Sequence, residues 1–145
     1  MKGKDEARRA RDSLSQVPLF AGLPPRHLKR IGDLTEEVCF MEGATVVRHG
    51  DAGDTFFVII EGEVKVAGPS GRVVNRLRPG EYFGEISLLD GGPRTASVVA
   101  ETPLTMLALS RSSLLRVVQR EPAVGVRLLG HVAMMLRRLE RSASG

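Results

Sequence analysis

The feature that most constrains the fold is a series of short apolar segments between residues 36 and 110, separated by glycine-rich turns. Residues 56–60 read Phe-Phe-Val-Ile-Ile, and the turn at 61–63 leads into the alternating segment 64–66. Another turn, Gly-Pro-Ser-Gly, occupies residues 68–71. Short β-prone segments at near-regular spacing are typical of antiparallel double sheets and barrels. We therefore expect an antiparallel β-roll or jelly roll over residues 36–110.

Later parts of this region continue the same pattern. A strand is expected at residues 72–77, after the second turn, and Pro79-Gly80 marks a third turn. Residues 94–100 and 104–109 are expected as two further strands, because they are apolar and are split by Thr102-Pro103.

Residues 1–35 have helical rather than strand-like patterning. A charged helix is expected from Lys4 to Leu14, and Pro24-Pro25 opens a second helix, since proline is tolerated in a first turn. Apolar residues then recur at helical spacing: Leu28, Ile31, Leu34 and Val38. The sequence predicts an N-terminal helical segment in front of the β-roll.

Two more helices are predicted within residues 111–141, followed by a tail at 142–145. Ser110 is a suitable N-cap for a helix that ends near Arg120, and Pro122 opens a longer helix. The long helix carries two adjacent apolar stripes, one of Val124, Leu128, Val132, Met135 and Leu139 and the other of Val126, Leu129, Ala133 and Leu136. Together they are wider than one core face needs, which predicts cover by a partner subunit or a ligand. The fold class is therefore mainly β with flanking helices (α+β).

The amino-acid composition disfavours several classes of function. The 145 residues suit one domain, carry a net charge of +4 and include no Trp, which disfavours an aromatic platform for single-stranded nucleic acid. The one cysteine, Cys39, excludes an intrachain disulfide and is expected to be buried. No apolar run approaches the roughly 18 residues that span a bilayer. We expect a cytoplasmic protein without a membrane segment.

The residues most informative about chemistry lie in the run 83–98. Gly84 allows a ligand to approach the backbone, and a short helical turn after it would present free N–H groups to an anion. Arg94 can bind two phosphate oxygens at once. Glu85, which only accepts hydrogen bonds, suits a sugar hydroxyl. Ser87 and Thr95 add hydroxyl donors.

Each of these residues also has an ordinary structural explanation. Gly84 could be a turn glycine, Ser87 a cap, and Glu85 with Arg94 an exposed ion pair of little energetic weight. Their order within twelve residues favours a ligand site instead. The three histidines, His27, His49 and His131, are scattered and form no metal-ligand pattern, so we expect no metal, no catalytic residues and no enzymatic activity.

The run 83–98 resembles the phosphate-binding cassette of cyclic-nucleotide-binding domains. The resemblance extends over most of the chain and includes residues 19–23 (Leu-Phe-Ala-Gly-Leu), 50–54 (Gly-Asp-Ala-Gly-Asp) and 61–64 (Glu-Gly-Glu-Val). It implies the fold of that family and a cyclic nucleotide as ligand, with no cofactor.

The resemblance also implies a role for each position of the cassette. Glu85 would bind the ribose 2′-hydroxyl, and Arg94 would pair with the exocyclic phosphate oxygens. Thr95 permits both cAMP and cGMP, of which cAMP is preferred. The remaining phosphate contacts would come from the backbone at Gly84, Ile86, Ser87 and the Thr95-Ala96 segment. The apolar wall beside the base would come from Val73 and Val74.

In the resembled family the last helix often closes over the base as a lid, and many ion-channel members place an arginine there. In this sequence Met135 falls at that position and Arg138 lies one turn further on, so the base contact departs from the family pattern. Met134 falls in an otherwise polar arc of the helix. Filling of the core remains an alternative for both methionines.

These observations predict a stand-alone sensor that relays cyclic-nucleotide binding through its C-terminal helices to a protein partner or, as a homodimer, to a second copy. Two alternatives stay open: an interaction module on a degenerate roll that no longer binds nucleotide, and the sensor part of a transcription regulator. Direct DNA binding is not expected, because the sequence ends a few residues after the long helix and contains no helix-turn-helix.

Overall fold

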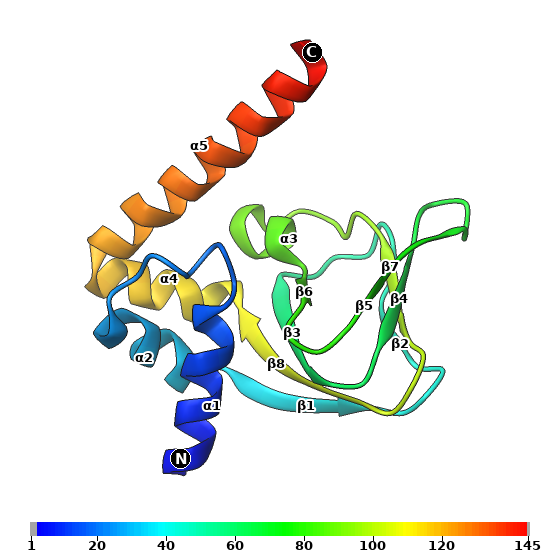
Figure 1. Cartoon of the computed structure of the whole chain (residues 1–145), viewed down its shortest axis with the longest axis horizontal. Helices are drawn as coiled ribbons and strands as arrows, with labels where there is room; N and C mark the ends of the chain where they lie inside the picture. Colours follow the sequence, from blue (N-terminus) through cyan, green and yellow to red (C-terminus); the bar gives the residue numbers. More distant parts are fainter. Residues whose placement is uncertain (1–2, 145) are drawn as a thin grey trace.

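The computed structural model describes residues 3–144, so residues 1–2 of the predicted N-terminal segment and residue 145 of the predicted tail lie outside it. Helices pack at one end of the strands (Figure 1). The helices are α1 (Lys4–Ser15), α2 (Pro25–Asp33), α3 (Glu85–Asp90), α4 (Arg111–Arg120) and α5 (Pro122–Ser144). The strands are β1 (Glu36–Phe40), β2 (Thr45–Val47), β3 (Thr55–Glu61), β4 (Val64–Ala67), β5 (Val73–Leu77), β6 (Tyr82–Phe83), β7 (Ser97–Ala100) and β8 (Leu104–Ser110).

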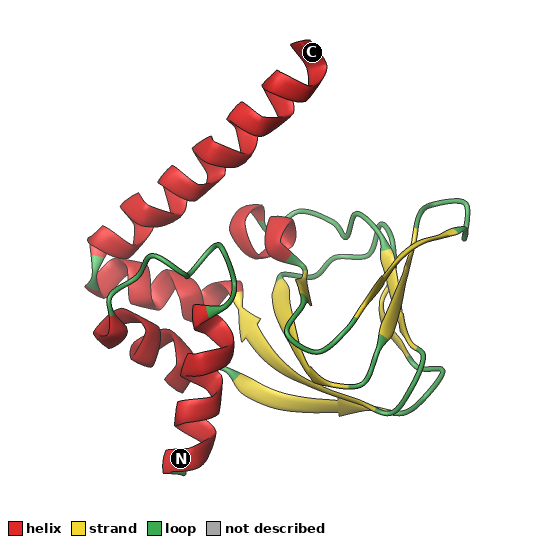
Figure 2. Cartoon of the chain, in the orientation of Figure 1, coloured by secondary structure: helices red, strands yellow, loops and turns green. Residues whose placement is uncertain are grey.

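The strands form two four-stranded antiparallel sheets. One sheet has the order β1-β8-β3-β6 and the other the order β2-β7-β4-β5. Figure 2 shows the strands gathered at one side of the molecule and α1, α2, α4 and α5 at the other, with α3 set between them. The predicted fold class, an antiparallel β-roll with N-terminal helices, a short cassette helix and C-terminal helices, is confirmed.

Strand β3 is the centre of the packing because both of its faces are buried. Phe56 and Val58 pack into a cluster with residues of the helices, whereas Phe57 and Ile59 pack into a second cluster against the other sheet. Alternate residues of a strand point to opposite faces, so one apolar run supplies both clusters. The sheet that contains β3 therefore lies between the helices and the second sheet and fixes their relative positions.

The two C-terminal helices begin at the positions that the sequence predicts. Ser110 caps α4, and its hydroxyl accepts a hydrogen bond from the Ser113 amide at 3.2 Å. Helix α5 packs through Val124 and Leu128 and then projects away from the body of the molecule (Figure 1). It ends at Ser144 rather than near Arg141, so most of the predicted tail is helical.

Three local predictions are wrong. Val38 belongs to β1 and not to the face of the second helix, which ends at Asp33. The strand expected from Arg94 begins at Ser97, because the Arg94 backbone is hydrogen-bonded to the turn at residues 50–51. Cys39 is exposed, because its neighbours Val38 and Phe40 take the inward positions of this edge strand.

Candidate functional site

A cavity of about 280 Å³ opens between the β-roll and α5. All seven residues predicted to form the ligand cassette line it: Gly84, Glu85, Ile86, Ser87, Arg94, Thr95 and Ala96. The structure thus brings the two halves of the run 83–98 together around one space. Its volume is close to the lower end of the range of small-molecule sites, which is about 300 Å³.

Gly84 begins the wall formed by α3. Its φ of 89° lies in the left-handed region, and a Cβ there would be 2.6 Å from the Thr55 carbonyl oxygen. Only glycine meets both conditions without strain. The Gly84 carbonyl accepts the first helical hydrogen bond from Leu88 at 3.0 Å, and the buried Ser87 lies in that first turn. Gly84 therefore allows α3 to start directly beside β3.

Arg94 is the charged group of the opposite wall and is only 7% exposed. Its Nη1 donates a hydrogen bond to the Thr55 carbonyl oxygen at 2.9 Å, the one hydrogen bond of this guanidinium to any residue in the range 3–144. Burial lowers the pKa of Arg94, an effect that nearby Asp54 partly offsets. A buried guanidinium with most donors free is suited to an anion.

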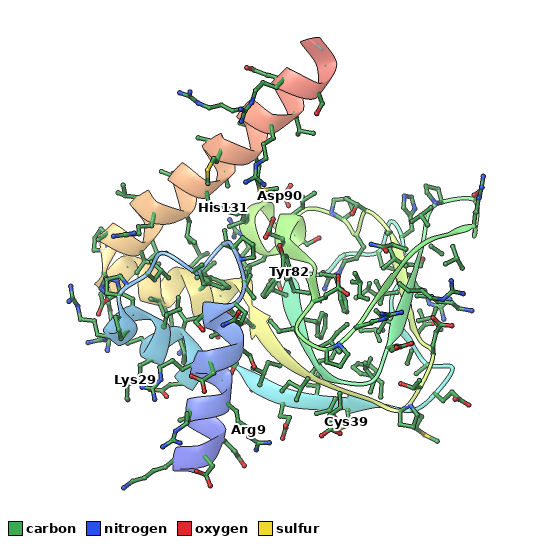
Figure 3. All side chains as sticks on the ribbon, viewed as in Figure 1. Arg9, Lys29, Cys39, Tyr82, Asp90 and His131 are labelled. Atoms are coloured by element: carbon green, nitrogen blue, oxygen red, sulfur yellow. The ribbon has the colours of Figure 1, made fainter. Side chains whose placement is uncertain are left out.

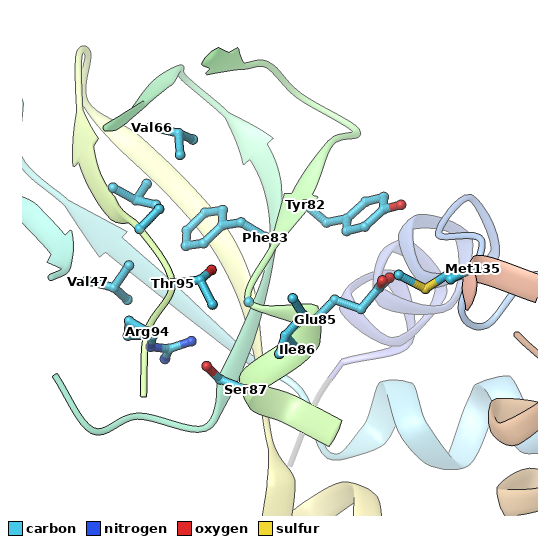
Figure 4. A pocket seen from close by; sticks show the side chains of 13 residues that line it. Val47, Val66, Tyr82, Phe83, Glu85, Ile86, Ser87, Arg94, Thr95 and Met135 are labelled. Atoms are coloured by element: carbon cyan, nitrogen blue, oxygen red, sulfur yellow. The ribbon is translucent and has the colours of Figure 1, made fainter. Parts of the chain in front are cut away.

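Glu85 points away from Arg94. In Figure 4 its carboxylate extends toward Met135, while the Arg94 guanidinium and the Ser87 hydroxyl lie together on the other side of the cavity. The Oε2 atom is buried and accepts no hydrogen bond from the part of the chain that the structure describes. Burial raises the pKa of Glu85, and the nearby His131 partly opposes this shift. The cavity thus separates a cationic end from a hydrogen-bond acceptor.

The apolar lining comes from side chains that are not predicted from the sequence to contact a ligand. Val47, Val66 and Val98 belong to β2, β4 and β7, and Phe83 stacks on Phe57 with ring centroids 5.0 Å apart. Tyr82 also faces the cavity. These side chains provide a surface on which a planar ring can lie.

Val73 and Val74, predicted to form the base wall, are not in this lining. They lie on β5, the edge strand of its sheet, and Val74 is 65% exposed. Val66, on the neighbouring strand β4, lines the cavity instead. The alternation of apolar and polar residues identifies the apolar side of a strand. It does not show which strand faces the cavity.

Helix α5 reaches the site at one of the predicted lid positions. Met135 lines the cavity, whereas Met134 is 51% exposed and Arg138 is also exposed, outside the lining. A residue not predicted from the sequence, His131, lies one turn before Met135 with its Nε2 atom 3.9 Å from Glu85 Oε2. Figure 3 labels His131 on α5 beside α3. The helix thus contributes one apolar and one ionisable group.

Comparison with known families agrees with this geometry. Residues 37–121 match the family model described as "Cyclic nucleotide-binding domain". The chain belongs to the cyclic nucleotide-binding domain family. The matched range runs from the second residue of β1 through β8 and α4 and includes the cassette helix α3, so it covers all the cavity residues except Met135.

Characterised members of the family that resemble this chain are regulators. It is 36% identical over 135 residues to the cAMP-dependent protein kinase regulatory subunit of Aspergillus fumigatus, covering 90% of this chain and 29% of that protein. It is 32% identical to the CRP-like cAMP-activated global transcriptional regulator of Mycobacterium tuberculosis, covering 86% and 58%. The chain therefore spans less than two thirds of either relative.

A solved structure shares the whole arrangement. The N-terminal domain of a transcriptional regulator from Streptomyces coelicolor superposes with a TM-score of 0.82 at 36% identity, covering 90% of this chain and 94% of that one. The cyclic nucleotide-binding domain described here thus has the same fold as a regulator's N-terminal domain. Within residues 3–144, no helix has the length and apolar character to cross a membrane. In the same range no three His, Cys, Asp or Glu side chains are grouped as a metal site.

Proposed function

We propose that this domain is a cAMP sensor, in which the cyclic phosphate binds at Arg94 and the ribose at Glu85. The observation that carries the proposal is the placement of these two residues at opposite sides of one cavity. Arg94 is a buried cation with free donors, and Glu85 is a buried acceptor. A nucleotide whose phosphate is closed onto its own ribose presents both an anion and a 2′-hydroxyl within one small molecule.

In this arrangement the guanidinium of Arg94 binds the exocyclic phosphate oxygens in a bidentate manner. Ser87, Thr95 and the backbone at Gly84, Ile86 and Ala96 surround the same phosphate. The carboxylate of Glu85 accepts a hydrogen bond from the 2′-hydroxyl, because an ionised carboxylate is an acceptor only.

The base lies against the valines of β2, β4 and β7 and is covered by Met135. Such apolar contact stabilises either purine, and Thr95 is compatible with both cAMP and cGMP. The preference for cAMP rests on two relatives, a cAMP-dependent protein kinase regulatory subunit and a cAMP-activated transcriptional regulator.

The signal leaves the domain through α5. Met135 couples the ligand to the position of this helix, because a ligand shifts a conformational equilibrium only through contacts that differ between the two states. Helix α5 carries exposed Val126, Leu129, Leu136 and Leu139. We propose that this apolar surface docks on a protein partner or on a second copy of the chain.

The test is calorimetric titration of the purified domain with cAMP and cGMP, with 5′-AMP as the open-phosphate control. We expect saturable binding of cAMP in the micromolar range or tighter, weaker binding of cGMP and much weaker binding of 5′-AMP. Equal affinity for cAMP and 5′-AMP would contradict recognition of the cyclic phosphate. Absence of heat from every ligand, in folded protein freed of nucleotide, would favour a degenerate roll that acts as an interaction module.

A further inference from the structure

His131 and Glu85 meet at the only polar contact that the structure shows between α5 and the cavity lining within residues 3–144. The side chains of both residues are 14% exposed, and His131 Nε2 lies 3.9 Å from Glu85 Oε2. This separation suits an ion pair and is longer than a hydrogen bond. The two residues are far apart in the sequence, so the contact exists only while α5 keeps its present position.

The other groups around Glu85 do not replace this contact. Tyr82, on β6, loses acidity partly because Glu85 is nearby, and its pKa is raised. Arg94 faces the cavity from the other side, and Arg111, from α4, donates to the Leu89 carbonyl oxygen at the far end of α3. His131 is the neighbouring group that lowers the pKa of the Glu85 carboxyl against the effect of burial.

His131 also shares a helix face with the residue that closes the cavity. Residues four apart on a helix lie one above the other, so His131 and Met135 point to the same side of α5. Met135 lines the cavity. A movement of α5 that withdraws Met135 from the base therefore also separates His131 from Glu85.

We propose that His131 is a positioning residue for Glu85, holding the carboxylate in the orientation that accepts from the ribose 2′-hydroxyl only when α5 is docked. The proposal rests on the function proposed above for Glu85. It makes recognition of the sugar depend on the helix as well as on the cassette. Because coupling between two sites is reciprocal, a 2′-hydroxyl bound at Glu85 then favours the docked position of α5.

The test compares three variants with the wild-type domain. His131→Leu removes the imidazole, His131→Gln keeps a donor near the Nε2 position without charge, and Arg137→Gln removes a charge from an exposed position of α5 as a matched control. Two measurements are made on each protein. The first is the pKa of the Glu85 carboxyl, measured by NMR titration of the ligand-free domain, and the second is calorimetric titration with cAMP and 2′-deoxy-cAMP.

We expect the pKa of Glu85 to be higher in His131→Leu than in the wild type and unchanged in Arg137→Gln. His131→Leu should weaken cAMP binding by about threefold to tenfold and leave 2′-deoxy-cAMP binding nearly unchanged. His131→Gln should recover part of the loss, because it retains a donor. In a Glu85→Gln background, the His131→Leu change should have no further effect on cAMP binding.

The outcomes separate this proposal from the proposed function. An unchanged Glu85 pKa in His131→Leu overturns the positioning role whether or not a nucleotide binds. Equal losses for cAMP and 2′-deoxy-cAMP also overturn it, because they indicate a general effect on the fold of the site. Failure of the wild-type domain to bind either ligand, with a pKa that does respond to His131, overturns the cAMP function while the electrostatic contact stands.

Discussion

The guanidinium of Arg94 lies directly against Gly53, where a Cβ atom would be only 2.7 Å from Arg94 Nε. Gly53 belongs to the turn between β2 and β3, and the backbone of this turn also holds Arg94. The Arg94 amide donates to the Asp51 carbonyl at 2.9 Å, and the Arg94 carbonyl accepts from the Gly50 amide at 2.8 Å. The turn therefore determines the position of the Arg94 guanidinium, although Gly53 itself does not line the cavity.

Gly53→Ala should consequently weaken cyclic-nucleotide binding by about tenfold or more, because the guanidinium must move and a charge-assisted hydrogen bond is worth about 1.5–3 kcal/mol. The thermal midpoint should change little, since the atoms in the way belong to the end of a side chain. Calorimetric titration and thermal unfolding measure the two effects.

Gly68→Ala is the matched control for this change. Gly68 is also a loop glycine, and its nearest neighbour for a new Cβ is a Val74 methyl at 4.0 Å. This variant should bind like the wild type. A Gly53→Ala protein with unaltered affinity would show that Arg94 tolerates displacement and that the turn has no part in the site.

Arg94 should strengthen nucleotide binding and at the same time lower the stability of the ligand-free fold. Burial lowers its pKa, which means that the folded ligand-free protein carries a poorly solvated cation. Arg94→Met should weaken binding of cAMP by about a hundredfold or more, because the phosphate loses a bidentate charged partner. The same variant should unfold at the same temperature as the wild type or higher.

Arg94→Lys separates charge from geometry in this experiment. Lysine keeps the charge and lacks the planar fork, so its affinity should fall between those of the wild type and Arg94→Met. A large loss of stability in both variants, with no selective loss of binding, would indicate that Arg94 is a structural residue of the turn.

The part of the site that can be predicted from sequence is the part that is local in the chain. Gly84 is the N-cap of one short helix that contains Glu85 and Ser87, and Arg94 and Thr95 follow within a few residues. Their chemistry and order indicate an anion end and an acceptor end before any tertiary contact is known. The strands of the β-roll are signalled equally locally by turns and apolar alternation, but their pairing is not: among the described strands only β4 and β5 are neighbours both in sequence and in a sheet.

Contacts between distant segments could not be predicted in this way. Predicting the apolar wall of the cavity requires knowing that β4 is internal and β5 is an edge strand, and both strands carry valines. The role of His131 depends on the angle at which α5 leaves α4, which no local pattern encodes. The strand expected from Arg94 starts late because a hydrogen bond from a distant turn holds its backbone.

The raised pKa of Glu85 predicts an effect of pH on stability. A carboxyl whose pKa is higher in the folded than in the unfolded state stabilises the fold when protonated, below the unfolded-state pKa. This contribution is lost as the pH rises through the folded-state value. Ionised Glu85 therefore destabilises the ligand-free domain at neutral pH. Glu85→Gln should raise the thermal midpoint at pH 7–8, and the difference should vanish in acid.

Thermal unfolding of both proteins across this pH range measures the effect. The neighbouring His131 and Tyr82 remain in both proteins, so the difference isolates Glu85. A midpoint of Glu85→Gln below that of the wild type at neutral pH would mean that the pair with His131 outweighs the burial of the carboxylate. The same variant should lose most of its discrimination between cAMP and 2′-deoxy-cAMP.

Glu121 holds the junction between α4 and α5 in place. Its carboxylate lies 2.5 Å from His27 Nε2 and 2.7 Å from Arg30 Nε, so one hinge residue is bound to two residues of α2. His27 is almost fully buried. The direction of α5, and with it the distance from His131 to Glu85, is therefore set partly by the N-terminal helices.

Glu121→Gln should lower the free energy of unfolding by about 1–3 kcal/mol, because it leaves the buried His27 without its charged partner. Hydrogen exchange in the first turns of α5 should become faster, and cAMP binding should weaken although Glu121 lies outside the cavity. The control variant Asp33→Asn breaks the exposed pair of Lys29 and Asp33 on α2. It should leave the free energy of unfolding, the exchange in α5 and the affinity for cAMP nearly unchanged. If Glu121→Gln lowers stability without altering exchange in α5 or ligand affinity, the hinge contact supports the fold alone and does not set the position of the helix.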